Sequence, residues 1–140
     1  MRQVTFICLL FLGLGCSTTK KTAMNNTILN GSWIPIKQAL GDKELPNVLF
    51  AKQKLVVSDS SYTVFAESID KGIVKYSDNK MDIYGKEGVN AGKHFTAIYK
   101  FDNEQLTICY NLEGDRYPET FETKGKPLYF LSVFKKELIK

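Results

Sequence analysis

The sequence has little cysteine and no long apolar run. Its three cysteines are Cys8, Cys16 and Cys109, and the first two lie close to the N-terminus. So little cysteine excludes a disulfide-stabilised scaffold. No segment reaches the roughly 18 consecutive apolar residues of a membrane-spanning helix. The 10 glycines and 4 prolines show no collagen-like period. These absences exclude multispanning membrane proteins and fibrous proteins.

Sequence motifs of known catalytic chemistry are also missing. The chain contains no His-Glu-x-x-His, no paired Cys-x-x-Cys, no Gly-x-Ser-x-Gly and no phosphate-binding glycine loop. His94 is the single histidine, so no metal site is expected around it. A nucleophilic Cys109 would need His94 as its base, whereas the apolar run around Cys109 favours a buried, inert thiol. We expect no enzyme activity, no metal and no cofactor.

The charge is close to balanced, with 19 basic and 15 acidic residues and a formal net charge of +4. Lysines are spread along the chain and acidic residues stand between most of them. A protein that tracks a phosphate backbone would instead gather its basic residues on one stripe. We expect a monomer that binds no nucleic acid.

What is present begins with the N-terminal segment MRQVTFICLLFLGLGC. Its basic start, its apolar run over 4–14 and the Gly15-Cys16 junction are typical of a secretory signal peptide. In a helix the apolar run would span about 16 Å, roughly half of a bilayer core, so it is too short for a permanent anchor. Residues 1–15 are therefore predicted to be cleaved.

The Gly15-Cys16 junction and the polar residues after it resemble the lipobox of bacterial lipoproteins. The resemblance implies that Cys16 is lipidated and tethers the protein to a membrane of the bacterial cell envelope. Ser17 after the cysteine favours the outer membrane, with the protein facing the periplasm, under the enterobacterial sorting rule. The alternative is an ordinary cleaved signal without a lipid.

Residues 16–28 have the composition of a flexible tether, and residues 29–140 are predicted to form one domain of short antiparallel strands. Polar turn residues separate most of the runs, and the only helix-compatible stretch, residues 44–54, starts near Pro46. The predicted strands cover Leu29–Lys37, Lys54–Ser58, Ser61–Glu67, Gly72–Tyr76, Lys80–Tyr84, His94–Phe101, Gln105–Asn111 and Leu128–Lys135, with a weak one at Thr120–Thr123.

Side chains along these runs alternate in character. Phe95, Ala97, Tyr99 and Phe101 share one face of their predicted strand, and the more polar positions share the other. Such strands have one buried face. Eight of them at this spacing favour an all-β fold of the barrel or sandwich type.

The order of the short motifs is similar to that of small lipocalin-like domains. The domain opens with Leu29-Asn30-Gly31-Ser32-Trp33, continues with Leu106-Thr107-Ile108-Cys109-Tyr110, and ends its motif series with Gly114-Asp115-Arg116-Tyr117-Pro118. These residues resemble an uncharacterised bacterial lipoprotein family with a Leu-x-Gly-x-Trp start and a Gly-Asp-Arg-Pro element near the end. The resemblance implies an eight-stranded antiparallel lipocalin-like barrel with short hairpins and at most one short helix, and it implies no activity.

Gly31 and Trp33 lie two residues apart and so share a strand face. We predict that glycine permits a close backbone approach and that the indole plugs one end of the barrel, rather than contacting a ligand. In lipocalins a cation of the last strand often lies across this tryptophan. The resemblance implies that Lys135 does so here through a cation–π contact.

One polar cluster, Asp115, Arg116 and Glu119, is a candidate loop site. Carboxylates beside an arginine bind ligands or act as acid and base, but Gly-Asp is also a turn signal. We favour the simpler interpretation, in which Asp115 and Arg116 order their loop.

The functional expectation follows from these features together. We expect a membrane-tethered module that binds a small apolar or amphipathic molecule at the open mouth of the barrel, near 85–92 or 114–118. The alternative is a filled barrel that serves as a structural or protein-interaction domain of the envelope. The many aromatic residues on the strands favour a small cavity at most.

Overall fold

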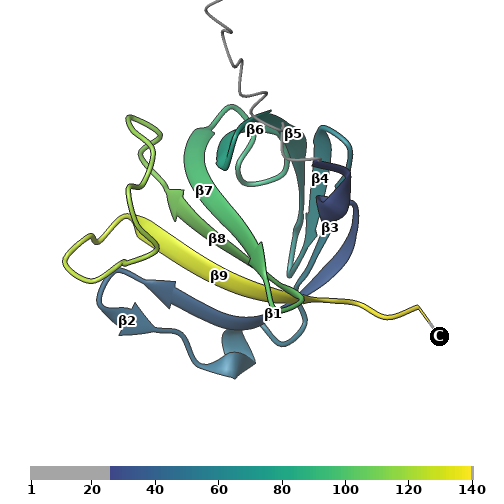
Figure 1. Cartoon of the computed structure of the whole chain (residues 1–140), viewed down its shortest axis with the longest axis horizontal. Coiled ribbons are helices and arrows are strands. Elements are labelled where there is room, and N and C mark those ends of the chain that lie inside the picture. Colours follow the sequence, from purple (N-terminus) through teal and green to yellow (C-terminus); the bar gives the residue numbers. More distant parts are fainter. Residues whose placement is uncertain (1–25, 140) are drawn as a thin grey trace, which may run out of the picture.

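The computed structural model describes residues 26–139 as nine strands and two short 3-10 turns (Figure 1). The strands are β1 Gly31–Leu40, β2 Lys43–Glu44, β3 Lys54–Ser58, β4 Ser61–Phe65, β5 Ile69–Ser77, β6 Lys80–Glu87, β7 His94–Asp102, β8 Gln105–Asn111 and β9 Tyr129–Lys136. The turns are η1 Asn26–Leu29 and η2 Asn47–Leu49. The signal peptide, Cys16 and most of the tether lie outside the described residues.

Eight of the strands close into an antiparallel barrel. Each strand from β3 to β8 pairs with the next one along the chain, and β1 pairs with both β3 and β9, which closes the sheet on itself. The short β2 adds only a hairpin at the end of β1. The sequence-based prediction of an eight-stranded antiparallel barrel is confirmed.

The two ends of the barrel differ in the length of their connections. At one end the β3–β4, β5–β6 and β7–β8 hairpins each turn within two residues, and Asp59, Asp78 and Asn103 adopt left-handed φ angles of 52°, 54° and 49° there. Short polar residues tolerate this conformation, as the sequence suggested. The opposite end carries the longer connections over 41–53, 88–93 and 112–128. Longer loops surround an opening, which we call the mouth.

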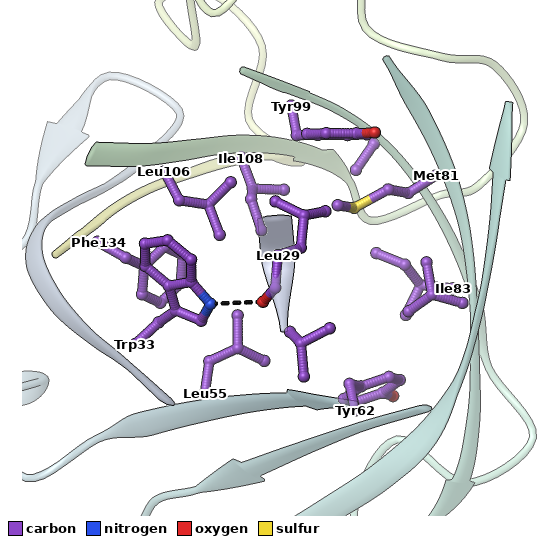
Figure 2. Close-up of a cluster of buried hydrophobic side chains, with 13 residues drawn as sticks. Leu29, Trp33, Leu55, Tyr62, Met81, Ile83, Tyr99, Leu106, Ile108 and Phe134 are labelled. Carbon is purple, nitrogen blue, oxygen red and sulfur yellow. Dashed lines mark hydrogen bonds between the residues drawn. The ribbon is translucent and has the colours of Figure 1, made fainter. Parts of the chain in front are cut away.

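The inward side chains form one cluster inside the barrel (Figure 2). Trp33, Tyr99 and Leu106 are almost completely buried, because each lies at an inward position of its strand. Tyr99 and Ala97 occupy the inward face of β7 together with Phe95 and Phe101, as the alternation predicted. Trp33 and Leu106 lie near the ends of their strands at the tight hairpins, so they fill that end of the barrel.

Two local predictions are wrong. Residues 120–123 form no strand and belong to the irregular β8–β9 loop. The first strand starts at Gly31 rather than Leu29, because Leu29 ends the 3-10 turn η1, which was not predicted. The helix-compatible stretch at 44–54 contains one short turn, the 3-10 turn η2, which starts after Pro46 as the sequence indicated.

Candidate functional site: an apolar cavity inside the barrel

A cavity of about 450 Å³ opens at the mouth and extends into the barrel. Its walls are mainly aliphatic and aromatic, and they come from the strands that surround the opening. The lining residues are Leu40, Leu45, Leu55, Val57, Tyr62, Val64, Val74, Tyr76, Met81, Ile83, Asn90, Lys93, Phe95, Ile108, Tyr110, Leu112 and Phe130. Pockets for small molecules typically measure about 300–1,000 Å³ and have mostly apolar walls. The aromatic side chains thus leave more room than the sequence suggested.

The β6–β7 connection forms one side of the mouth, where Asn90 and Lys93 line the cavity. This loop folds back tightly on its own strand. A Cβ at Gly85 would lie 1.9 Å from the Asn90 carbonyl oxygen, so the close approach requires glycine there. The buried Asp70 carboxylate accepts a hydrogen bond from the Asn90 backbone N–H at 3.0 Å. The position of the mouth at 85–92 matches the expectation.

The cavity wall contains three phenol groups, those of Tyr62, Tyr76 and Tyr110. Burial raises the pKa of Tyr76 to about 12. Burial, reinforced by the neighbouring phenols of Tyr62 and Tyr76, raises the pKa of Tyr110 even further. The pKa of Tyr62 is raised by burial and by the Asp70 carboxylate. The cavity wall therefore disfavours negative charge.

Trp33 closes the end of the barrel opposite the mouth. Its indole N–H donates to the Leu29 carbonyl oxygen at 2.7 Å (Figure 2), and its ring meets Phe101 edge-on at 6.0 Å. It is fully buried and is not among the residues that line the cavity. Its geometry is that of a plug.

The cation over Trp33 is Lys136, not Lys135. The Lys136 ammonium lies 5.5 Å from the indole ring, and a Cβ on Gly31 would lie 3.0 Å from the Lys136 side chain. Phe134 and Lys136 share a face of β9 because they are two residues apart, whereas Lys135 lies exposed on the other face. Gly31 permits the close approach of this lysine.

Asp115 and Arg116 order their loop through Asn111. The Asn111 side-chain amide donates to an Asp115 carboxylate oxygen at 2.7 Å and to the Arg116 carbonyl oxygen at 3.0 Å. The Arg116 guanidinium donates to Asp115 at 3.2 Å. The hydrogen bond from Asn111 and the Arg116 charge lower the pKa of Asp115, although partial desolvation opposes them. Glu119 is exposed and lies apart from the shallow groove that Asp115 and Arg116 line.

The β8–β9 loop does not reach the mouth beyond Leu112, because it crosses the outer wall of the barrel. The hydroxyl of Thr96, on the outer face of β7, donates to the Arg116 carbonyl oxygen at 2.5 Å. Farther along the loop, the ring of Phe121 lies under the Lys100 ammonium at 5.0 Å. The expectation that 114–118 would line the cavity is therefore wrong.

A second polar cluster on this outer wall was missed. The Tyr117 hydroxyl donates to one carboxylate oxygen of Asp82, and His94 Nε2 lies 2.7 Å from the other. His94 also stacks on Tyr84, with ring centroids 4.7 Å apart. Burial raises the pKa of Asp82, but the bonds to Tyr117 and His94 outweigh it and leave the pKa lowered. These contacts pin the loop to β6 and β7.

Cys109 is fully buried on β8. Burial raises its pKa to about 11, although the Lys126 charge opposes the rise. A protonated, enclosed thiol agrees with the inert role that the apolar surroundings indicated.

Two other kinds of feature are absent from residues 26–139. No helix in that part of the chain is long and apolar enough to cross a membrane. The same residues contain no group of three or more His, Cys, Asp or Glu side chains arranged to hold a metal ion.

Comparison with known proteins supports the fold alone. No protein-family model and no curated protein matches the sequence. The chain is similar in structure to an uncharacterized protein from Bacteroides eggerthii, with a TM-score of 0.50 and 11% sequence identity over 78% of this chain and 99% of that one. Any statement on function must therefore rest on the cavity itself.

Proposed function

We propose that the protein is a lipid-anchored, lipocalin-like module of the bacterial cell envelope that binds one small apolar or amphipathic molecule in its barrel without converting it. The observation that carries this proposal is the apolar cavity of about 450 Å³ with one open end. Burial of apolar ligand surface stabilises a complex by roughly 25 cal/mol per Å² before the costs of association. The cavity favours a binding barrel over a filled one.

Native mass spectrometry tests whether a ligand is bound. All strand pairs of the barrel lie between Gly31 and Lys136, so a soluble chain from Lys21 to Lys140 retains the whole fold. After exposure to an extract of its own cells, we expect this chain to carry an adduct of constant mass that disappears on denaturation. A bare chain from every extract would favour the filled-barrel alternative.

A cavity-filling substitution predicts the loss of that adduct. Val64 lines the cavity from β4 and is only partly buried, so a larger side chain there displaces the ligand before it strains the core. We expect Val64→Trp to lower the bound fraction at least about tenfold. Displacing even two or three methylene groups of the ligand from the cavity weakens the binding free energy by about 1.4 kcal/mol or more. The matched control is Val48→Trp, at a position 81% exposed outside the cavity. Equal occupancy in the two variants would refute binding in the barrel.

The proposed anchor is Cys16, and it makes a separate prediction. In a bacterial host, we expect the full-length chain to incorporate labelled acyl chains and to sediment with membranes, and Cys16→Ser to abolish both. The control is Cys109→Ser, which removes the buried thiol of β8. Membrane association that survives Cys16→Ser would contradict lipidation at this residue.

The proposed anchor would join the barrel at its closed end. The described chain enters at η1, where the Leu29 carbonyl oxygen accepts a hydrogen bond from Trp33. A tether attached there leaves the mouth, at the opposite end of the barrel, free for a ligand to enter.

A further inference from the structure

The hydroxyl groups of Tyr62, Tyr76 and Tyr110 have no hydrogen-bond partner within residues 26–139, although all three tyrosines line the cavity. Other polar groups of the core are paired. The Tyr99 hydroxyl donates to the Asp78 carbonyl oxygen at 3.1 Å, and the Trp33 N–H donates to Leu29. No fully buried side-chain N or O atom of the described residues lacks a partner, so these three hydroxyls are open to the cavity. A ligand that displaces water from the cavity must therefore supply a hydrogen-bond acceptor or leave the phenols unpaired, which is costly in an apolar environment.

The three side chains approach the cavity from different walls. Tyr62 comes from β4, Tyr76 from β5 and Tyr110 from β8, on the other side of the barrel. Tyr62 and Tyr76 lie near enough to Tyr110 to influence its ionisation. Gly72 leaves the space that the Tyr62 ring needs, since a Cβ there would lie 2.8 Å from the Tyr62 hydroxyl. Tyr62 and Tyr76 adjoin the tight β3–β4 and β5–β6 hairpins and so lie in the inner part of the cavity, and Tyr110 lies across from them on β8.

The surroundings of the phenols indicate a neutral acceptor. Lys93 is the one charged side chain among the residues that line the cavity, and it lies at the mouth. A carboxylate at the inner end would be buried without a cation, which is unfavourable. A carbonyl oxygen has two lone pairs for O–H donors and carries no net charge.

We propose, on the basis of the proposed binding function, that the ligand carries a neutral carbonyl oxygen on the end that enters the barrel first, and that two of the three phenols of Tyr62, Tyr76 and Tyr110 donate hydrogen bonds to its two lone pairs. The apolar body of the ligand then fills the outer cavity. Specificity lies in the phenols, since the remaining walls accept any apolar shape of the right size.

Equilibrium dialysis of three related probes against the chain from Lys21 to Lys140 tests this inference. The probes are naphthalene, 1-tetralone, which adds a carbonyl to a bicyclic body of similar size, and 1-naphthoate, which adds a carboxylate. We expect 1-tetralone to bind about fivefold more tightly than naphthalene, as one net hydrogen bond allows, and 1-naphthoate to bind less tightly than 1-tetralone.

Variants identify the donors. The combined variant Tyr62→Phe, Tyr76→Phe, Tyr110→Phe should reduce the preference for 1-tetralone to less than about twofold. Tyr110→Phe alone should reduce it partly, and Tyr84→Phe, on the outer wall, should leave it unchanged. No hydrogen bond within residues 26–139 is lost in the combined variant, so the fold is retained.

The outcomes separate the two proposals. Equal binding of naphthalene and 1-tetralone, a preference for 1-naphthoate, or an unchanged preference in the combined variant overturns the carbonyl inference and leaves the binding function standing. Failure of all three probes to bind the unmodified chain overturns the inference and also counts against the proposed function.

Discussion

Replacement of Trp33 by alanine is expected to lower the free energy of unfolding by about 3–5 kcal/mol, the range measured for large aromatic side chains in protein cores. Trp33 is completely buried at the closed end of the barrel. Its removal leaves a cavity between β1 and β9 and exposes the ring of Phe101 on one side. Small domains have stabilities of about 5–15 kcal/mol, so this one change removes a large share of the total.

The indole also makes contacts that packing alone does not describe. Its N–H satisfies the Leu29 carbonyl, and its ring lies under the Lys136 ammonium. Trp33→Phe retains an aromatic ring but leaves the Leu29 carbonyl unpaired, so we expect a smaller loss of about 1–3 kcal/mol. Stability should therefore increase from Trp33→Ala to Trp33→Phe to the unmodified chain. This order tests both the packing and the hydrogen bond.

Urea denaturation followed by far-ultraviolet circular dichroism measures these differences, since Trp33 is the only tryptophan and its fluorescence is lost in both variants. Val48→Ala is the control, because its side chain is 81% exposed and its loss should change stability by less than about 0.5 kcal/mol. A Trp33→Ala variant as stable as the control would show that Trp33 is not the plug.

The strands were predictable because their signal is local. The alternation along 94–101 assigns Tyr99 to the inward face without any knowledge of the other strands. Short polar residues such as Asp59 and Asp78 mark the hairpins directly. The same period of two places Lys136 on the face of Phe134, so the assignment of Lys135 to Trp33 contradicted the pattern of its own strand.

The site was less predictable because it depends on contacts between distant segments. Nothing near His94 in the sequence indicates that Asp82 lies beside it or that Tyr117 reaches the same carboxylate. The path of the β8–β9 loop over the outer wall depends on those contacts, and it keeps Asp115 away from the mouth. The cavity volume depends on how all the inward side chains pack together, which residue counts do not reveal.

The phenols inside the barrel predict a second large effect, a loss of stability in alkaline solution. Burial raises the pKa of Tyr76 from the ordinary 10.0 to about 12, and it also raises the pKa of Tyr110. Below pH 10 both phenols are neutral in the folded and unfolded chains, and the stability is fully present. As the pH rises from about 10 to 12, the unfolded chain ionises first, and the folded state loses stability.

The expected magnitude follows from the size of the shift. The pKa of Tyr76 is raised by about two units, and each unit corresponds to about 1.36 kcal/mol of stability. Reduced for solvent access through the mouth, the loss of folding free energy is on the order of 2 kcal/mol for Tyr76 alone. Tyr110 and Tyr62 act in the same direction. The total loss should therefore exceed that of Tyr76 alone.

Urea denaturation at about pH 9 and about pH 11 measures this loss of stability. Absorbance at about 295 nm follows the ionisation of the phenols over the same range. Lysines also deprotonate in this range, so the comparison must be with the variants Tyr76→Phe and Tyr110→Phe, which lack one ionisable phenol each. We expect each variant to lose less stability than the unmodified chain between the two pH values. If all three chains lose the same amount of stability, the phenols have the same pKa in the folded and the unfolded chain. The interior of the barrel would then be open to bulk water.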